Sequence, residues 1–371
     1  MIKTYTYKIK PNKSVQRRFE EQVGICRYVY NLGREVREES FKKGVNINYF
    51  ALSKQLTEAK KDFDWLRQVN SQTLQAVLER LELGYKKFFA DLKKGNKTSK
   101  PKWAKKDKWR SLPFKQGNLK KSKPDLRFEQ DGRFNLPKFG KIKLFKSKTP
   151  KGEIRTASII READGLYLKI VVREENISQE RENQSVCAID MGINFFLTTS
   201  DGEFVENPKH LFNYLKELRV ENRKLSRMKK GGNNWKKQVK VLQLLHQKIS
   251  RVRKDFLHKQ SRGLANNYST VIREDLNISK MVKDSKLAKH ILDCSWGLFF
   301  ELLEYKTNIV KVNPAYSSQT CSKCKHTSKE NRKTQSLFEC INCGYTENAD
   351  LQATFNLLQR GQSLMEAKTD H

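Results

Sequence analysis

Two Cys-x-x-Cys pairs near the C-terminus constrain the fold of this chain more than any other feature of its sequence. Cys321 and Cys324 form the first pair, and Cys340 and Cys343 form the second after a spacer of fifteen residues. Two pairs at this spacing place four thiolates in a tetrahedron around a structural Zn²⁺, which leaves no open coordination position for catalysis. The sequence therefore predicts a zinc ribbon, for which we expect the bounds 314–345.

The remaining cysteines and the N-terminus indicate the compartment. Cys26, Cys187 and Cys294 lie in apolar contexts typical of a core, and His326 is a weaker alternative zinc ligand. An odd total of seven cysteines, four of them in metal-type pairs, favours a reducing compartment over a disulfide framework. The opening MIKTYTYKIK lacks the apolar stretch of a signal peptide, and no apolar run approaches the ~18 residues of a membrane span. We therefore expect a cytoplasmic protein without a membrane partner.

The charge of the chain points to a polyanionic partner. Lys and Arg number 75 against 41 Asp and Glu, a net charge of +34. Such a surplus opposes compaction through self-repulsion unless a polyanion neutralises it, which favours nucleic acid and argues against an enzyme of small molecules. Aromatic residues at 10% argue against a disordered chain. Charge alone does not separate a binding protein from an enzyme.

The most basic segment spans residues 96–124, where eleven Lys and Arg face one acid, Asp107. Lysines match phosphates and flat rings can stack on bases, so this mixture favours a nucleic-acid surface. The alternative is a solvated loop whose tryptophans pack into a neighbouring core. The candidate contact residues are Lys100, Lys102, Trp103, Lys105, Lys106, Trp109 and Arg110.

Hydrophobic periodicity divides the chain into two parts. A strand at 2–9 is followed by helices, and then by short alternating runs with turn signals that predict strands from 125 to 178. The polar stretch 178–185 predicts a domain boundary, and the pattern after it is α/β. The predicted helices are 14–40, 48–60, 71–92, 211–229, 234–260, 287–305 and 350–359, and the later strands are 186–190, 270–274 and 308–312 with a hairpin at 194–206.

Three acids stand at the ends of these elements. Asp190 and Glu274 each end a short apolar strand, and Asp350 begins the last helix. Carboxylates in such positions can converge on Mg²⁺, and two ions held in this way cleave phosphodiesters. Asp350 could instead merely cap its helix, and Asp275 could cap or turn after the strand. Taken singly, each acid has an ordinary structural explanation, and it is their combined pattern that favours a nuclease site.

At these residues the chain resembles the TnpB family, the OrfB-type proteins of bacterial insertion sequences. The motifs that carry the resemblance are AIDMGINFFLTTSDG, REDLNISKM, FFELLEYKTNIVKVNPAYSSQTCSKC and ECINCGYTENADLQATFNLL. The opening MIKTYTYKIKPN and ICRYVYNLGRE are also similar, so the resemblance covers nearly the whole chain. Members of this family are RNA-guided DNA endonucleases related to type V CRISPR effectors.

The resemblance implies an α+β multidomain fold. A small wedge-like β-barrel would form from residues 1–10 and 115–180, with a helical recognition domain inserted at 11–114. A RuvC-type, RNase H-like α/β nuclease domain would comprise 184–313 and 346–371, with the zinc ribbon inserted in it.

The resemblance also implies the activity and its partners. Asp190, Glu274 and Asp350 would hold catalytic Mg²⁺ or Mn²⁺, and a guide RNA from the end of the element would pair with double-stranded DNA beside a short adjacent motif. We expect a monomer. Three positions depart from the family pattern, with Gln352 where Asn is usual, Thr354 where Ala is usual, and Lys325 where Gly is usual.

Three alternative functions remain. One is an RNA-guided regulator that binds DNA without cutting it, which the complete set of three acids disfavours. Another is a cut-and-paste transposase, which the zinc ribbon between the second and third acids disfavours. The last is a compact type V CRISPR effector, against which the length of 371 residues argues mildly.

Overall fold

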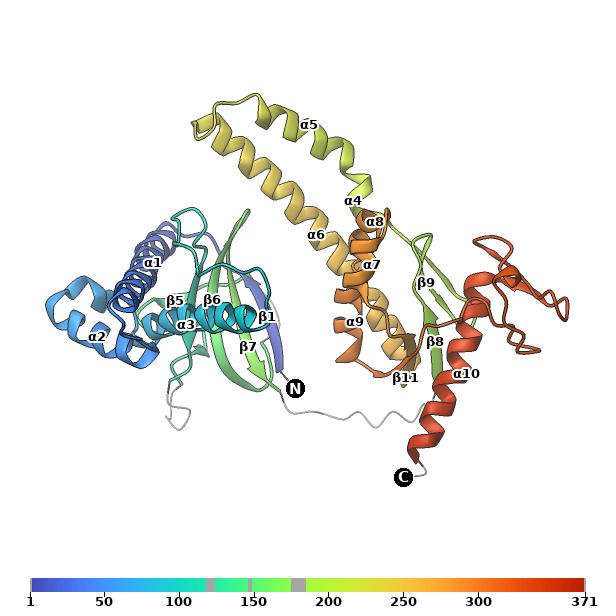
Figure 1. Cartoon of the computed structure of the whole chain (residues 1–371). Coiled ribbons are helices and arrows are strands. Elements are labelled where there is room, and N and C mark those ends of the chain that lie inside the picture. Colours follow the sequence, from blue (N-terminus) through green and yellow to red (C-terminus); the bar gives the residue numbers. More distant parts are fainter. Residues whose placement is uncertain (1, 118–123, 146–148, 175–184, 370–371) are drawn as a thin grey trace. The chain divides into compact units, whose positions relative to one another are not determined.

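The computed structural model describes residues 2–117, 124–145, 149–174 and 185–369. The chain divides into two compact units, Met1–Ser178 and Gln179–His371 (Figure 1). This division falls at the polar stretch where the sequence predicts a boundary. Within the described ranges, no helix has the length and apolar character needed to cross a membrane.

Three asparagines set the start of the helices in the first unit. Asn12, Asn48 and Asn70 each accept a hydrogen bond from a backbone N–H in the first turn, which satisfies one of the donors that a helix start leaves open. Gly33 allows close packing of the first helix, because a Cβ there would lie 2.8 Å from Leu78 Cδ2. The helices are α1 (Lys13–Lys42), α2 (Tyr49–Asp62), the 3-10 helix η1 (Asp64–Gln68) and α3 (Ser71–Lys93).

The strands of this unit form two antiparallel sheets. The larger has the order β1-β7-β6-β2, and the smaller is a meander in the order β3-β4-β5. Alternate residues of the larger sheet point into one core shared with the helices, as Leu112 and Phe114 show. The strands are β1 (Ile2–Lys8), β2 (Ser111–Lys115), β3 (Arg127–Phe128), β4 (Phe134–Leu136), β5 (Gly140–Ile142), β6 (Glu153–Glu162) and β7 (Gly165–Arg173).

The predicted wedge-like barrel is wrong as a closed barrel for the described part of this unit. β1 pairs only with β7 and β2 only with β6, so both are edge strands of an open sheet. The meander is joined to β1 through a single bridge, Ile9 to Leu144. The physical reason lies in the core, where Phe19 of α1 and Leu74 of α3 cover the apolar face of the sheet, so that the sheet need not curl onto itself.

The second unit contains a mixed sheet in the order β10-β9-β8-β11-β12. β8, β11 and β12 run parallel, whereas β9 and β10 are added as antiparallel strands. The central strands are buried on both faces, which explains their continuous apolar sequences. The strands are β8 (Val186–Asp190), β9 (Phe195–Thr199), β10 (Phe204–Glu206), β11 (Thr270–Glu274) and β12 (Asn308–Val312).

Helices cover both faces of this sheet (Figure 1). Leu257 of α6 and Phe299 of α9 pack with Ile189 on one face, and Leu357 of α10 packs with Ile272 on the other. The helices are α4 (His210–Asn213), α5 (Leu215–Ser226), α6 (Asn233–Asn267), α7 (Ile278–Asp284), α8 (Ala288–Cys294), α9 (Trp296–Glu304) and α10 (Ala349–Thr369).

The single helix predicted over 287–305 is divided in the structure. Ser295 adopts a left-handed backbone conformation with φ of 55° and separates α8 from α9. A serine in this conformation is uncommon, and the sequence gives no signal for it. The segment between β12 and α10 adds the 3-10 helix η2 (Lys329–Asn331) and the hairpin of β13 (Leu337–Glu339) and β14 (Thr346–Asn348).

The contact of α10 with the sheet yields a test of the fold. A Cβ at Gly361 would lie 2.3 Å from Ile272 Cδ1, whereas a Cβ at Gly263, which is exposed on α6, would meet nothing within 4 Å. We expect Gly361→Ala to lower the free energy of unfolding by about 1–3 kcal/mol through overpacking. Gly263→Ala should raise it by about 0.5–1 kcal/mol through helix propensity. Urea denaturation of both variants measures this, and equal effects would contradict the close packing.

Candidate metal centres

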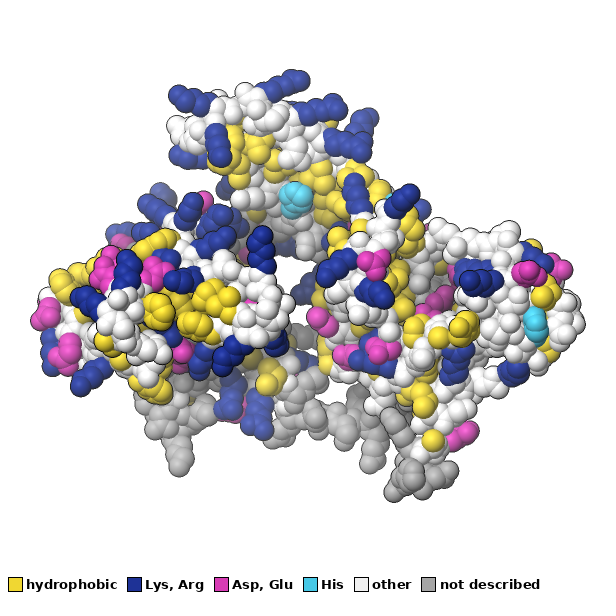
Figure 2. All heavy atoms as spheres, viewed as in Figure 1, with side chains coloured by type: hydrophobic (Ala, Val, Ile, Leu, Met, Phe, Trp, Pro, Cys, Tyr) yellow, Lys and Arg dark blue, Asp and Glu magenta, His cyan; other side chains and the backbone are white. Residues whose placement is uncertain are grey.

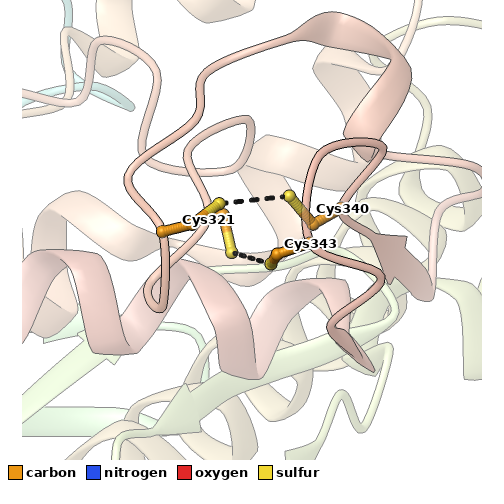
Figure 3. Close-up of side chains that lie close together, drawn as sticks. Cys321, Cys340 and Cys343 are labelled. Atoms are coloured by element: carbon orange, nitrogen blue, oxygen red, sulfur yellow. Dashed lines mark hydrogen bonds between the residues drawn. The ribbon is translucent and has the colours of Figure 1, made fainter.

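The four cysteines form one compact cluster. Their Sγ atoms all lie within 4.8 Å of one another, with 3.7 Å between Cys321 and Cys343 and 3.5 Å between Cys324 and Cys340 (Figure 3). Cys321 and Cys340 are buried. Four thiols at these separations could hold one metal ion, which suits a structural Zn²⁺. Among the described residues, this is the one such group of His, Cys, Asp and Glu side chains.

Both cysteine turns are built in the same way. In each, a backbone N–H following the second cysteine returns to the carbonyl of the first, from Lys325 to Cys321 and from Gly344 to Cys340. Lys325 and Gly344 are both left-handed, with φ of 63° and 71°. The turn therefore explains why glycine suits this position, and Lys325 adopts the same conformation at some cost in strain. The backbone N–H of His326 lowers the pKa of the Cys324 thiol to about 6.

The fold brings the three acids toward one region of the second unit. Asp190 ends β8 and Glu274 ends β11, which are adjacent parallel strands whose register pairs Ile189 with Arg273. The two acids therefore follow at the same edge of the sheet. Asp350 is the second residue of α10, the helix that packs across these strands. The acids are separated by many residues in sequence, and only the sheet order and α10 bring them together.

The pKa of Asp190 is raised by burial and by the charges of the other two acids. Burial and the negative charges of Glu274 and Asp350 raise it to about 7, and the guanidinium of Arg332 opposes the rise. Burial also raises the pKa of Glu274 and of Asp350. A carboxylate whose ionisation is opposed by two others is a site where a cation would be bound favourably. The donor set of three carboxylates fits Mg²⁺ or Mn²⁺ in chemistry.

Two further residues, missed by the sequence analysis, hold the acids in place. The Ser317 hydroxyl donates a hydrogen bond of 2.6 Å to Glu274 Oε1, and Ser317 is buried. Arg332 donates a hydrogen bond of 3.2 Å from Nη2 to Asp350 Oδ1. Both lie in the cysteine segment, between β12 and β14. Nothing in their spacing could have singled them out, because each meets its acid only after the segment has folded back.

The alternative interpretation of Asp350 as a simple helix cap does not describe the structure. Asn348 Oδ1 accepts hydrogen bonds from the backbone N–H groups of Asp350 at 2.9 Å and Leu351 at 3.2 Å, so Asn348 performs the capping. The Asp350 carboxylate is thereby left to face Arg332 and Asp190.

Gln352 has a different task from the acids. Its amide Nε2 donates to the Thr320 carbonyl at 2.9 Å, and its Oε1 accepts from the Ser322 hydroxyl at 2.9 Å. Asn356, one turn later, donates to the carbonyls of Ser317 and Thr320. These buried amides attach α10 to the first cysteine turn. The departure from the family pattern at Gln352 thus falls on a structural contact.

The basic segment lies in the first unit and is partly exposed. Asn31 and Arg34 of α1 hold its backbone through hydrogen bonds to Ala104 and Pro101. Trp103 is 49% exposed and stacks beneath the Arg34 guanidinium, whose Cζ lies 4.2 Å from the ring centre. The exposed candidates are Lys100, Lys102, Trp103, Lys105, Lys106 and Arg110.

The inclusion of Trp109 among the contact residues requires correction. Trp109 is 7% exposed, and its ring packs against Tyr30 at 5.1 Å between centres. It therefore belongs to the core, as the alternative interpretation of this segment expects. Figure 2 shows a further basic surface along the α5–α6 hairpin, where Lys216, Arg219, Arg223 and Lys224 belong to α5.

Comparison with known proteins identifies the family. Residues 169–285 match the OrfB family model of IS605 elements, described as a probable transposase, and residues 296–357 match the TNB domain of Cas12f1-like proteins. Residues 1–45 match the helix-turn-helix model of the same OrfB group, although in the structure this stretch contains β1 and the single helix α1. An Escherichia coli (strain K12) protein named "Putative RNA-guided DNA endonuclease InsQ" is 30% identical over 98% of this chain and 93% of its own length. The chain belongs to the TnpB family.

Other relatives agree with this membership. A Streptomyces pristinaespiralis protein named for the same activity is 28% identical over 97% of this chain and 89% of its own length. The solved structure of the mini RNA-guided endonuclease CRISPR-Cas phi3 has a TM-score of 0.51 at 11% identity, over 97% of this chain and 92% of that one. This structural likeness concerns the fold alone.

The raised pKa of Asp190 predicts a pH-dependent stability. In the folded chain the Asp190 carboxyl binds its proton more tightly than in an unfolded chain, where an ordinary aspartate has a pKa of ~3.9. The contribution of this group to the free energy of unfolding is therefore fully present below pH ~4 and decreases as the pH rises from ~4 to about 7. We expect Asp190→Asn, in zinc-loaded protein without other divalent ions, to be more stable than wild type at pH 8 by on the order of 1–3 kcal/mol. Near pH 4 the difference should vanish. Thermal melting measures it, with the exposed Asp275→Asn as control, and a pH-independent difference would contradict the repulsion.

The cysteine cluster predicts a link between zinc and the acids. We expect the Cys340→Ser protein to lose its zinc and to melt at a lower temperature. We also expect faster backbone hydrogen exchange around Ser317 and Asn356, because the four cysteines fix the segment that Asn356 attaches to α10. Elemental analysis and exchange mass spectrometry measure these effects. Cys187→Ser, which removes a buried thiol outside the cluster, should keep its zinc. A Cys340→Ser protein with full zinc content would show that the four thiols do not bind it.

Proposed function

We propose that this protein is a transposon-encoded, RNA-guided DNA endonuclease. It binds a guide RNA from the end of its element and cleaves complementary double-stranded DNA beside a short adjacent motif, in the cytoplasm of its bacterial or archaeal host. The observation that carries the proposal is the placement of Asp190 and Glu274 at the ends of adjacent parallel strands, with Asp350 on the helix that packs on them; burial and the charges of the other two acids raise the pKa of Asp190 to about 7. Full-length similarity to a relative named for this activity supports it.

The sheet of the second unit supports a RuvC-type, RNase H-like assignment. An antiparallel three-stranded ribbon, β8 to β10, continues into the parallel strands β11 and β12. The first two acids stand at the carboxyl ends of the central strands, and the third stands at the start of the helix that covers them. This arrangement is the one that the resemblance implies for Asp190, Glu274 and Asp350.

The side chains of the site have distinct tasks in this proposal. The three carboxylates would hold Mg²⁺ or Mn²⁺, which when bound activates a water and stabilises the leaving oxygen of a phosphodiester. Asp190 must give up its proton for this, so cation binding strengthens as pH rises through about 7. Ser317 fixes one oxygen of Glu274. Arg332 forms an ion pair with Asp350 in the free protein.

The positive charge of the chain fits the proposed partners. A guide RNA and its heteroduplex with DNA are held mainly through their phosphates and their shape. The exposed lysines near Trp103 and the cations of the α5–α6 hairpin offer such contacts in each unit. We propose the four-cysteine zinc centre as a purely structural element of the nuclease unit.

The test begins with co-expression of the gene and its flanking DNA. We expect a discrete RNA to purify with the protein and to end in sequence from beyond the element. A DNA carrying that end should be cut in Mg²⁺. Asp190→Ala, Glu274→Ala and Asp350→Ala should each reduce cutting by at least ~100-fold while RNA still binds, because each removes a metal ligand. Asp275→Ala, which removes the exposed neighbour of Glu274, should cut normally.

The outcomes separate the candidate functions. Guided binding without cutting by the wild type would indicate a regulator. Joining of DNA ends in place of simple cleavage would indicate a transposase. Cutting at near wild-type rate by any of the three alanine variants would overturn the assignment of these acids.

A further inference from the structure

An aromatic groove in the first unit has no role in the site described above. It has a volume of about 870 Å³ and lies between α1 and the segment that joins α2 to η1. Its lining comes from Glu20, Glu21, Val23, Gly24, Ile25, Arg27, Tyr28, Phe63, Trp65 and Lys106.

Three large rings are exposed in this groove. Tyr28 is 49% exposed, Phe63 51% and Trp65 36%. Tyr28 and Trp65 meet edge to face with 5.2 Å between ring centres, and Phe63 lies 6.3 Å from Trp65. A cluster of exposed aromatic rings is costly in water and typically marks a binding surface. Their faces offer stacking area for another flat group.

The charges around the rings select a negatively charged ligand. Glu20 forms an ion pair with Arg161, and Glu21 lies 3.7 Å from Arg17, so both acids are matched by arginines. Arg27 and Lys106 form no ion pair with any carboxylate in the described part of the chain. Lys106 belongs to the basic segment. The groove thus combines apolar rings with two unmatched cations, which suits a nucleotide.

Gly24 supplies an independent observation. It lies in the interior of α1, where glycine weakens a helix relative to alanine. A Cβ at Gly24 would meet nothing within 4 Å, whereas a Cβ at Gly33 in the same helix would clash with Leu78. Packing within the chain therefore explains Gly33, whereas Gly24, like Gly263 of α6, has no packing reason; Gly24 differs from Gly263 in that it lines the groove. A flat ligand that approaches the helix backbone beside Tyr28 would explain it.

We propose that this groove binds an unpaired nucleotide of the guide RNA. The base stacks on the Trp65 ring and meets the Tyr28 ring, which stands at 79° to it, at its rim beside the bare backbone at Gly24, and the phosphates of the nucleotide contact Arg27 and Lys106. RNA is favoured over target DNA because folded RNAs display single-stranded loops with unstacked bases, whereas DNA arrives as a duplex or pairs with the guide. This inference rests on the proposed function and names a contact for its RNA.

The experiment measures binding of a short, fluorescein-labelled single-stranded RNA of mixed sequence to the full-length protein over a range of salt concentrations. We expect Trp65→Ala to raise Kd about tenfold, and Trp65→Phe to restore most of the affinity. The dependence of log Kd on log salt should be unchanged in Trp65→Ala and should be shallower by about one in Lys106→Ala. This separates stacking from charge.

Gly24→Leu fills the groove without removing a ring. It should weaken RNA binding while the melting temperature stays level or rises, because leucine is the better helix former.

Phe50→Ala is the matched control for Trp65→Ala, since Phe50 is an exposed ring outside the groove at 76% exposure. A 4-thiouridine version of the RNA should cross-link to the peptides that contain Tyr28 or Trp65.

Three results would overturn the proposal. Unchanged Kd in both Trp65→Ala and Gly24→Leu would remove the groove from RNA binding, while guided cleavage by the wild type would leave the proposed function standing. A self-association of the wild type that Trp65→Ala abolishes without any effect on RNA would identify a second copy as the occupant. A wild-type protein that neither binds RNA nor carries a guide would remove the proposed function and this contact together.

Discussion

Burial of three carboxylates, reinforced at Asp190 by the negative charges of the other two, is the constraint around which the candidate site of the second unit is built. Parallel pairing of β8 with β11 leaves Asp190 and Glu274 side by side, and α10 adds Asp350. In a chain of net charge +34 the cations that face these acids are arginines, with Arg332 paired to Asp350 and Arg360 near Glu274. The guanidinium of Arg332 is also held by the Gln335 carbonyl, to which it donates a hydrogen bond of 2.9 Å.

The cysteine segment is what supplies these counter-groups. Ser317 and Arg332 flank the first cysteine turn and reach two different acids. Asn331, which is fully buried, ties the segment together by donating to the Gln319 and His326 carbonyls and accepting from the Ile341 N–H. The thiol cluster therefore acts on the acids through a connected set of hydrogen bonds, although it touches none of them.

The sequence predicts elements that rest on local signals. The strands at 186–190, 270–274 and 308–312 have the predicted bounds because they are short segments centred on apolar, mostly β-branched residues. Features that depend on packing between distant parts of the chain cannot be predicted from local sequence patterns. Ser295 breaks a helix without a glycine or proline to signal it, and Trp109 is buried by Tyr30, which lies far away in the sequence. The barrel was wrong because α1 and α3, rather than strand closure, cover the sheet.

The same distinction explains which parts of the site were predictable. Cysteine spacing is a local signal, whereas Ser317 and Arg332 are ordinary residues whose partners only the fold reveals. Two of the departures from the family pattern, Lys325 and Gln352, are informative here, because both lie where the first cysteine turn meets α10. Lys325 accepts a left-handed backbone, and its Nζ donates to the Ser322 carbonyl and to Gln359 of α10. Gln352 reaches back from α10 to Thr320 and Ser322.

Lys325 reaches from the first cysteine turn to α10, and Gln352 reaches from α10 back to that turn. The strain of a left-handed lysine, on the order of 1 kcal/mol, is offset where its ammonium group gains two acceptors. The cysteine turn is thereby fixed to the helix that carries Asp350. Lys325 and Gln352 thus both take part in the attachment of the first cysteine turn to α10, and neither removes any of the seven proposed ligands, four thiols and three carboxylates.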